Sequence, residues 1–233
     1  MAKNNMYDWI GYCWNPLAGR CEHRCSYCST NRLRSRFDVC KNKYEGKYRI
    51  IEREIKNLYD KHHDAQTVFV CSQNDLFEKS VPWFIIDRIT DHCEKYSKNT
   101  YVFQSKNPLK MLYHHYPGGI YGTTIETNRV KYLKKYSAST TSTAYHQRIE
   151  GITNKRYLDY KTFVTIEPIM DFDIEILVKD LYFIRPDFIN IGADSKKNNL
   201  PEPNKEKVVD LINRLKEFTE VRLKSNLKRI IGY

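Results

Sequence analysis

Three cysteines lie within one eight-residue stretch near the start of the chain, Cys-Glu-His-Arg-Cys-Ser-Tyr-Cys at positions 21–28. For Cys21, Cys25 and Cys28 to serve one site, the chain must form a tight loop here. Iron–sulfur clusters that only transfer electrons are usually held by four thiolates. Three thiolates leave one iron open, and an open iron can bind a substrate or cofactor directly. The C-x3-C-x2-C spacing therefore predicts a cluster with one free iron site, bound by these three cysteines.

Two other uses of the cysteines stay open at this point. A structural zinc ion needs four ligands, and His23 or Cys40 could complete them, although structural zinc ligands usually come as two spaced pairs. Disulfides are disfavoured because seven cysteines is an odd number and the first residues lack the apolar core of a secretory signal. We therefore expect a reducing, cytoplasmic compartment, with Cys71 and Cys93 as small buried residues.

Length and composition favour a single domain. The 233 residues, 41% of them hydrophobic, suffice for one large core, so we expect one domain over residues 1–233. No apolar run approaches the roughly 20 residues of a membrane-spanning helix, so no membrane partner is expected. The net charge of +11 would suit nucleic acid, but the sequence has no helix-turn-helix, RNP or arginine-rich signature. A nucleic-acid partner is therefore possible but not favoured.

Short β-rich runs alternate with helical patterns along the chain. The predicted strands are Tyr7–Trp14, Thr67–Ser72, Thr100–Gln104, Gly119–Ile125, Thr162–Glu167, Phe188–Gly192 and Glu220–Leu223. The predicted helices are Lys47–Lys61, Val81–Lys98, a short one from Pro108, Arg129–Tyr136, Asp173–Phe183 and Asn204–Phe218. This alternation indicates an α/β fold with a parallel sheet, and six or seven such units indicate a partial (β/α)6-type TIM barrel.

Polar residues directly follow most of the predicted strands. In a barrel of parallel strands these positions converge on one mouth, where the active sites of such folds lie. The cysteine loop follows the first strand, so we expect it over the same opening. Each acid among them has an alternative role as the ion-pair partner of a lysine such as Lys106 or Lys224. The residues are Ser72–Asp75, Ser105, Lys106, Glu126, Glu167 and Asp194.

Together with the cysteines, Trp14-Asn15-Pro16, Phe69–Phe77 and Thr165-Ile166-Glu167-Pro168 resemble motifs of the radical S-adenosylmethionine (SAM) superfamily. The resemblance spans most of the chain and is to a compact branch from phages and bacteria that includes the queuine lyases. It implies a partial TIM barrel, a [4Fe-4S] cluster, SAM, and a 5′-deoxyadenosyl radical that abstracts a substrate hydrogen atom. It also implies an electron donor such as flavodoxin or ferredoxin.

The resemblance implies roles for the residues at the mouth. The Gly-Gly-Glu that usually binds the SAM amino group is missing, and Ser72, Gln73, Asn74 and Asp75 stand in its place. We expect these four, with Lys106 and Glu126, to bind SAM, Glu126 at the ribose. The carboxylates of Glu167 and Asp194 would accept hydrogen bonds from a 7-deazaguanine, and Trp14 and Tyr27 would stack on a planar ring.

The reaction implied is that of a queuine lyase, which cleaves free queuine to release 7-aminomethyl-7-deazaguanine. Two alternatives are a radical SAM enzyme acting on a base in DNA or RNA, and a non-catalytic iron–sulfur or zinc-binding module. The Ser- and Thr-rich segment Ser137–Thr153 is expected to be either a loop that closes the site or an ordinary connection.

Overall fold

The computed structural model of the protein describes residues 7–56, 65–137 and 144–232. Seven parallel strands form its main sheet: β1 (Tyr12–Trp14), β4 (Thr67–Val70), β5 (Thr100–Ser105), β6 (Ile120–Thr124), β7 (Lys161–Ile166), β8 (Phe188–Ile191) and β9 (Glu220–Leu223). They lie side by side in that order, each paired in parallel with the next. Two further strands, β2 (Leu17–Ala18) and β3 (Arg49–Ile50), form a small antiparallel sheet.

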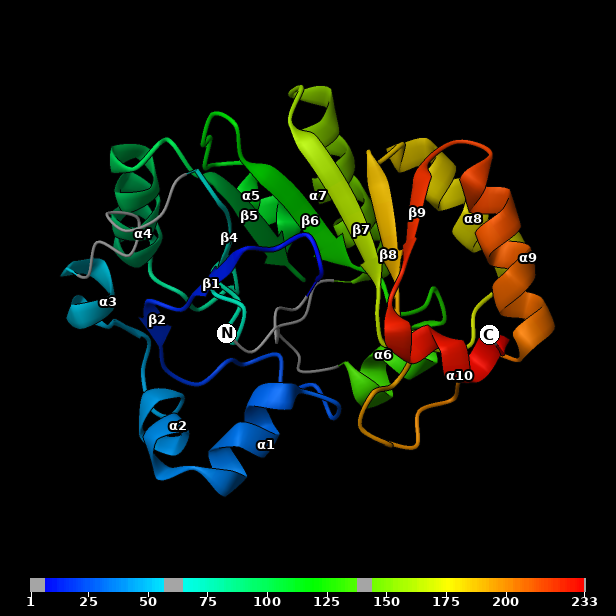
Figure 1. Ribbon diagram of the computed structural model, residues 1–233, viewed down its shortest axis with the longest axis horizontal. Helices are drawn as coiled ribbons and strands as arrows, with labels where there is room; N and C mark the ends of the chain where they lie inside the picture. The colour runs from blue at the N-terminus through cyan, green and yellow to red at the C-terminus, as the bar shows by residue number, and fades with distance from the viewer. Residues whose placement is uncertain (1–6, 57–64, 138–143, 233) are drawn as a thin grey trace.

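The remaining elements are helices, and some of them cover the outside of the curved sheet. They are α1 (Ser29–Arg36), α2 (Asp38–Lys43), α3 (Glu52–Lys56), α4 (Trp83–Lys95), α5 (Pro108–Met111), α6 (Val130–Tyr136), α7 (Tyr145–Tyr157), α8 (Ile174–Ile184), α9 (Lys205–Lys216), the 3-10 turn η2 (Ser225–Leu227) and α10 (Lys228–Ile231). Figure 1 shows α4, α5, α7, α8 and α9 along the sheet, and α1 and α2 beyond its lower edge. The expected partial (β/α) barrel is confirmed. None of the helices described is long and apolar enough to cross a lipid bilayer.

The central strands are buried on both faces, as parallel sheets require. Every residue of β6 and of β8 is buried. Cys71, directly after β4, and Cys93, in α4, are buried among the same apolar side chains, as expected. The continuous apolar runs in the sequence therefore predicted these strands because neither of their faces needs polar residues.

The first strand is shorter than predicted. Only Tyr12–Trp14 joins the sheet, whereas Tyr7–Ile10 turns inward and packs against Phe69, Phe163 and Phe188. The rings of Phe163 and Phe188 stack at 5.2 Å, and the Tyr7 hydroxyl donates to Gln104 Oε1 at 2.7 Å. We call Tyr7–Ile10 the floor segment, because it fills the barrel interior. Its apolar residues have the composition of a strand, but in the structure they pack inside the barrel.

The helix predicted over Lys47–Lys61 is wrong at its start. Arg49–Ile50 forms β3 instead, and the helix that follows, α3, begins at Glu52. The backbone N–H of Ile51 donates to Pro16 O at 2.8 Å, so this segment bonds to another part of the chain before the helix begins. The end of the predicted helix, residues 57–61, lies outside the described residues. Helices α1 and α2, which follow the cysteine loop, were not predicted.

The loop predicted over Ser137–Thr153 is wrong for its second half, because α7 begins at Tyr145. Ile149 and Ile152 lie on the buried face of this helix, and the Gln147 side chain accepts a hydrogen bond from the backbone N–H of Ala144 at its start. The Ser- and Thr-rich residues 138–143 lie outside the described residues. Polar composition before the helix hid its apolar spacing.

Lys155 of α7 gives the fold a pH dependence that can be measured. Its ammonium is buried over the rings of Tyr121 and Tyr160 and donates to His114 O at 2.6 Å. Burial lowers the pKa of Lys155 to about 8, below its value in the unfolded chain. Between pH 8 and 9.5 the unfolded chain therefore binds more protons at Lys155, so the contribution of this residue to the free energy of unfolding should rise with pH. Urea unfolding of the protein and of Lys155→Met checks this: the free energy of unfolding of the protein relative to that of the variant should rise over this range, because the buried thiols, whose pKa values are raised, act alike in both.

Candidate active site

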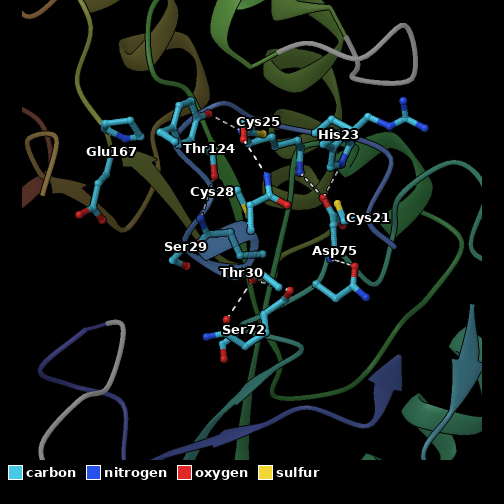
Figure 2. A pocket seen from close by; sticks show the side chains of 18 of the residues that line it. Cys21, His23, Cys25, Cys28, Ser29, Thr30, Ser72, Asp75, Thr124 and Glu167 are labelled. Atoms are coloured by element: carbon cyan, nitrogen blue, oxygen red, sulfur yellow. Dashed lines mark hydrogen bonds and ion pairs between the residues drawn. The ribbon is translucent and has the colours of Figure 1, made fainter. Parts of the chain in front are cut away.

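A cavity of about 340 Å³ opens at the carboxyl ends of the strands (Figure 2). Its wall is built from the segments after β4, β5, β7 and β8, which contribute Asp75, Lys106, Glu167 and Asp194 respectively, and from the cysteine loop. The structure thus brings together residues that are far apart in the sequence. A volume in this range is typical of pockets for small molecules.

Cys21, Cys25 and Cys28 all line this cavity. The loop that carries them is fixed by main-chain bonds: Ser26 N donates to Tyr136 O at 2.9 Å, and Cys28 N donates to Cys25 O at 3.1 Å. Helix α1 begins directly after Cys28. Burial raises the pKa of the Cys21 thiol, so this sulfur becomes a ligand only when a cation displaces its proton.

The donor set fits a cluster better than a single zinc ion. Within residues 7–56, 65–137 and 144–232, no three His, Cys, Asp or Glu side chains are close enough to hold one metal ion. A multi-iron cluster spreads its thiolates more widely, because each binds a different iron. His23, a candidate fourth zinc ligand, instead donates from Nε2 to Asp75 Oδ2 at 2.8 Å. Cys40 lies on α2 and is not part of the cavity wall.

The residues after β4 form a loop that is held by hydrogen bonds to Asn15 and Gly19, which lie just before the cysteine loop in the sequence. Asn15 Oδ1 accepts from Ser72 Oγ at 3.1 Å and from Gln73 N at 3.0 Å. Asn74 Nδ2 donates to Gly19 O at 3.0 Å. The asparagine of the Trp-Asn-Pro motif therefore shapes the loop in which SAM binding is predicted.

Asp75 is a buried anion with its hydrogen-bonding capacity in use. It accepts from His23 Nε2, from Lys106 N at 2.9 Å and from Phe77 N at 3.0 Å. Burial alone would raise the pKa of Asp75, but these donors lower it below its usual value. The second ring nitrogen of His23, Nδ1, is buried and has no hydrogen-bond partner among the described residues. Such an orphaned atom in the cysteine loop is consistent with a bound group that the protein itself does not supply.

Lys106 and Glu126 form the centre of a second polar cluster. Lys106 Nζ donates to Glu126 Oε1 at 2.6 Å and to Cys25 Sγ at 2.9 Å. Arg148 Nη1 donates to Glu126 Oε2 at 2.7 Å, and the Tyr27 hydroxyl also bonds Glu126. Burial raises the pKa of Glu126, but Lys106 and Arg148 lower it by more, so the carboxylate stays ionised. Glu126 is fully buried beneath these partners. Its contact with a ribose stays a prediction, and it requires these polar side chains to move apart.

The two acids predicted to recognise a base also have protein partners. Lys224 Nζ donates to Glu167 Oε2 at 2.7 Å, and Asn226 Nδ2 donates to Glu167 Oε1 at 3.0 Å. Asp194 accepts from Lys196 N at 3.0 Å and from the Asn198 side chain at 2.6 Å. Both acids line the cavity, and the ion-pair alternative is realised for Glu167.

Of the two predicted stacking rings, only Tyr27 lines the cavity. Trp14 has no exposed surface, its ring lies 4.7 Å from that of His92, and its indole N–H donates to Glu54 O at 3.2 Å. The prediction that Trp14 contacts substrate is therefore corrected: its side chain points from β1 into the core. Alternation along a strand places Cys13 and Trp14 on opposite faces, and the sequence did not show which face was inside.

Several residues that shape the site carry no signal of their own in the sequence. In the sequence Asn15 is only one residue of a motif, His23 suggests only a zinc ligand, and Arg148 lies in the segment expected to be a loop. Their roles depend on contacts between segments distant in the chain, which spacing patterns do not report.

Comparison with known proteins agrees with this architecture. The profile of the family described as "Protein of unknown function (DUF5131)" matches residues 4–202. Spore photoproduct lyase complexed with dinucleoside spore photoproduct is similar in structure, with a TM-score of 0.60 at 11% identity over 89% of this chain and 74% of that one. Streptococcus suis SuiB bound to S-adenosylmethionine gives a TM-score of 0.55 at 10% identity, over 92% of this chain and 47% of that one. No curated protein matches the sequence significantly. At these identities the likeness concerns the fold.

Proposed function

The chain belongs to the family of proteins of unknown function DUF5131, and from its site we propose that it is a radical SAM enzyme. One observation carries the proposal: three thiols from a single loop line a cavity at the mouth of a partial (β/α) barrel. Two structures with a similar fold, a spore photoproduct lyase variant and SuiB, are described with bound AdoMet or S-adenosylmethionine. The proposed cofactors are accordingly a [4Fe-4S] cluster on Cys21, Cys25 and Cys28, and SAM.

In this proposal the cluster and SAM would supply, after one-electron reduction, a carbon-centred radical that removes a hydrogen atom from the substrate. The protein's residues bind and orient. Asp75 and His23 hold the cysteine loop against the loop after β4, whose Ser72 and Gln73 are fixed by Asn15. The floor segment keeps water away from the inner end of the cavity, where Tyr7 bonds Gln104 and Thr165.

For the substrate we propose queuine, cleaved to 7-aminomethyl-7-deazaguanine. The resemblance to the queuine lyase branch suggests it, and the cavity wall carries the carboxylates of Glu167 and Asp194. A carboxylate accepts hydrogen bonds from the donor edge of a guanine-like ring and attracts a cationic amine. Both carboxylates already accept hydrogen bonds from the protein, Glu167 from Lys224 and Asn226 and Asp194 from its own loop, so the base would share them with these partners.

A base within DNA or RNA is a second candidate substrate, favoured by the charge of the cavity rim. Arg20, Arg24 and Lys196 line the cavity, are exposed, and form no ion pair among the described residues. Three cations of this kind could neutralise phosphates on either side of a base. The similar spore photoproduct lyase is described in complex with a dinucleoside ligand.

Anaerobic turnover with SAM and dithionite distinguishes the two substrates. We expect 7-aminomethyl-7-deazaguanine to form from queuine at a rate that changes little between about 50 and 200 mM salt, since a free base releases no counterions. Mass spectrometry of the products measures this, with Arg24→Ala expected to match the unaltered protein. A single-stranded oligonucleotide that is turned over instead, with a steep loss at the higher salt and a further loss in Arg24→Ala, would refute queuine and favour the second candidate.

A further inference from the structure

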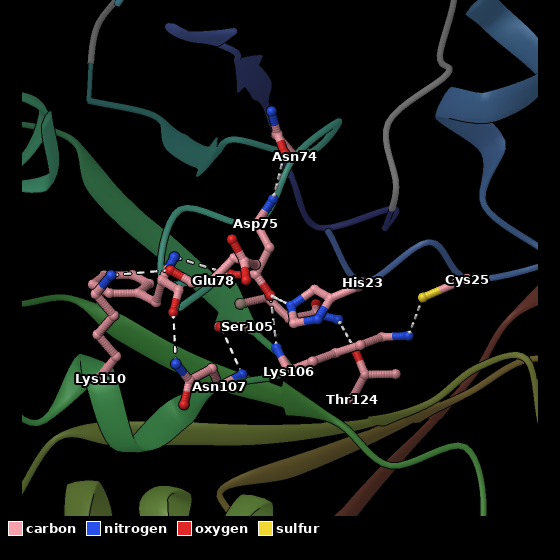
Figure 3. A network of polar contacts seen from close by, with 12 residues as sticks. His23, Cys25, Asn74, Asp75, Glu78, Ser105, Lys106, Asn107, Lys110 and Thr124 are labelled. Carbon is pink, nitrogen blue, oxygen red and sulfur yellow. Dashed lines mark hydrogen bonds and ion pairs between the residues drawn. The ribbon is translucent and has the colours of Figure 1, made fainter. Parts of the chain in front are cut away.

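Buried charged side chains form a continuous row that ends at one of the three cysteines. Arg148 contacts Glu126 at 2.7 Å, Glu126 contacts Lys106 at 2.6 Å, and Lys106 Nζ lies 2.9 Å from Cys25 Sγ. Figure 3 shows the Lys106 side chain extending from the end of β5 to the Cys25 sulfur. The exposed fractions of the Arg148, Glu126 and Lys106 side chains are 1%, 0% and 11%. The row is thus shielded from water. In such a buried site the interaction between charges is stronger and reaches further than at the surface.

The row leaves an excess of positive charge beside the sulfur. Two cations, Arg148 and Lys106, share the single carboxylate of Glu126. Glu126 and the Ser137 hydroxyl, 3.0 Å from Lys106 Nζ, hold the ammonium in place, and one of its hydrogens is directed at Cys25. Arg148 is fixed in turn by a hydrogen bond to Thr124 O at 2.8 Å. An ion pair with Glu126 alone would not require Lys106 to lie against a thiol.

We propose that Lys106 is a positioning residue that sets the reduction potential of the cluster through a hydrogen bond to the Cys25 thiolate. This inference rests on the proposed function, because it requires Cys25 to bind the cluster. A donor on a ligating sulfur withdraws negative charge from it and favours the more negative, reduced cluster. The step concerned is the transfer of one electron to the cluster from a one-electron donor such as dithionite or a reduced flavoprotein. Arg148 and Glu126 act through Lys106 by fixing its position.

Redox titration of the reconstituted protein, followed by electron paramagnetic resonance without SAM, tests the proposal. Lys106→Met removes the charge and the donor at similar length, and we expect full iron and sulfide content with a midpoint potential shifted to lower values. Lys155→Met is the matched control: it also removes a buried ammonium, but one that bonds His114 O and lies outside the cavity wall, so its potential should not shift. Equal potentials in Lys106→Met and the unaltered protein would overturn the proposal, whatever happens to the melting temperature.

A measurement on the unaltered sequence covers the case in which Lys106→Met fails to fold or to load. Protein labelled with 15N-lysine should show weak 15N coupling to the reduced cluster in pulsed resonance spectra, again without SAM. The absence of that coupling would also overturn the proposal. Failure of the cluster assignment looks different, because the unaltered protein would then bind no cluster at all, and failure of the radical chemistry alone would show as a loaded cluster without SAM cleavage.

Discussion

Cys25→Ala is expected to lose the iron–sulfur cluster, and with it all SAM cleavage. Cys21, Cys25 and Cys28 are the proposed protein ligands of the cluster, and Cys25 is the most buried of these three, in the middle of the loop. Removing one leaves two ligands, too few to hold four irons against loss to solvent. Anaerobic reconstitution followed by iron and sulfide analysis and the visible spectrum measures the outcome, with about four iron and four sulfide expected in the unaltered protein.

Two other cysteines serve as controls for this experiment. Cys13 and Cys40 are partly exposed like Cys21 and Cys28, but neither lines the cavity. Cys13→Ala and Cys40→Ala should therefore keep the full iron content. A Cys25→Ala protein with normal iron and sulfide would contradict the assignment of the site. Loss of the cluster in Cys40→Ala would indicate that Cys40 is a fourth ligand.

Glu126→Ala is expected to lower the free energy of unfolding by about 3–5 kcal/mol, the usual consequence of breaking a buried ion pair from one side. The carboxylate compensates two buried cations, Lys106 and Arg148, at 2.6 and 2.7 Å. Without it both ammonium and guanidinium remain in a site with little water, and each carries the full penalty of desolvation. Urea unfolding at pH 7, read by circular dichroism, measures the change.

Glu52→Ala provides the comparison for an exposed pair. Glu52 contacts Arg88 at 2.7 Å, with about half of each side chain exposed. Solvent screening limits such pairs to less than about 1 kcal/mol, so this variant should unfold almost as the unaltered protein does. A loss in Glu126→Ala as small as that in Glu52→Ala would mean that Lys106 and Arg148 find other compensation.

The sequence predicts the strands of the barrel well because burial on both faces leaves a direct trace in composition. β4 and β8 are short, mostly apolar runs with polar side chains a few residues beyond their ends, such as Ser72 and Asp194, and the structure brings these side chains to one cavity. The position of the cysteine loop followed from the same logic. Local composition and strand order therefore sufficed for the fold and for the general location of the site.

The contacts within the site were much less predictable. Glu126 was expected to face a cofactor, but Arg148 from α7 and Lys106 cover it, and α7 itself was hidden behind a polar segment. Trp14 was expected at the mouth, but the direction of its side chain depends on the register of β1 against β4. Both outcomes depend on pairings between distant segments, which a single sequence does not contain.

The floor segment makes the cavity a dead end within the described part of the chain. Tyr7 is almost fully buried, and its hydroxyl bridges Gln104 of β5 and Thr165 of β7 directly below the cavity. Molecules that reach the inner end must pass the rim. A molecule bound at the rim therefore prevents the release of a molecule bound further inside. In the proposed chemistry SAM and the substrate would therefore enter and leave through one opening, so the order of their binding and release is set at the rim.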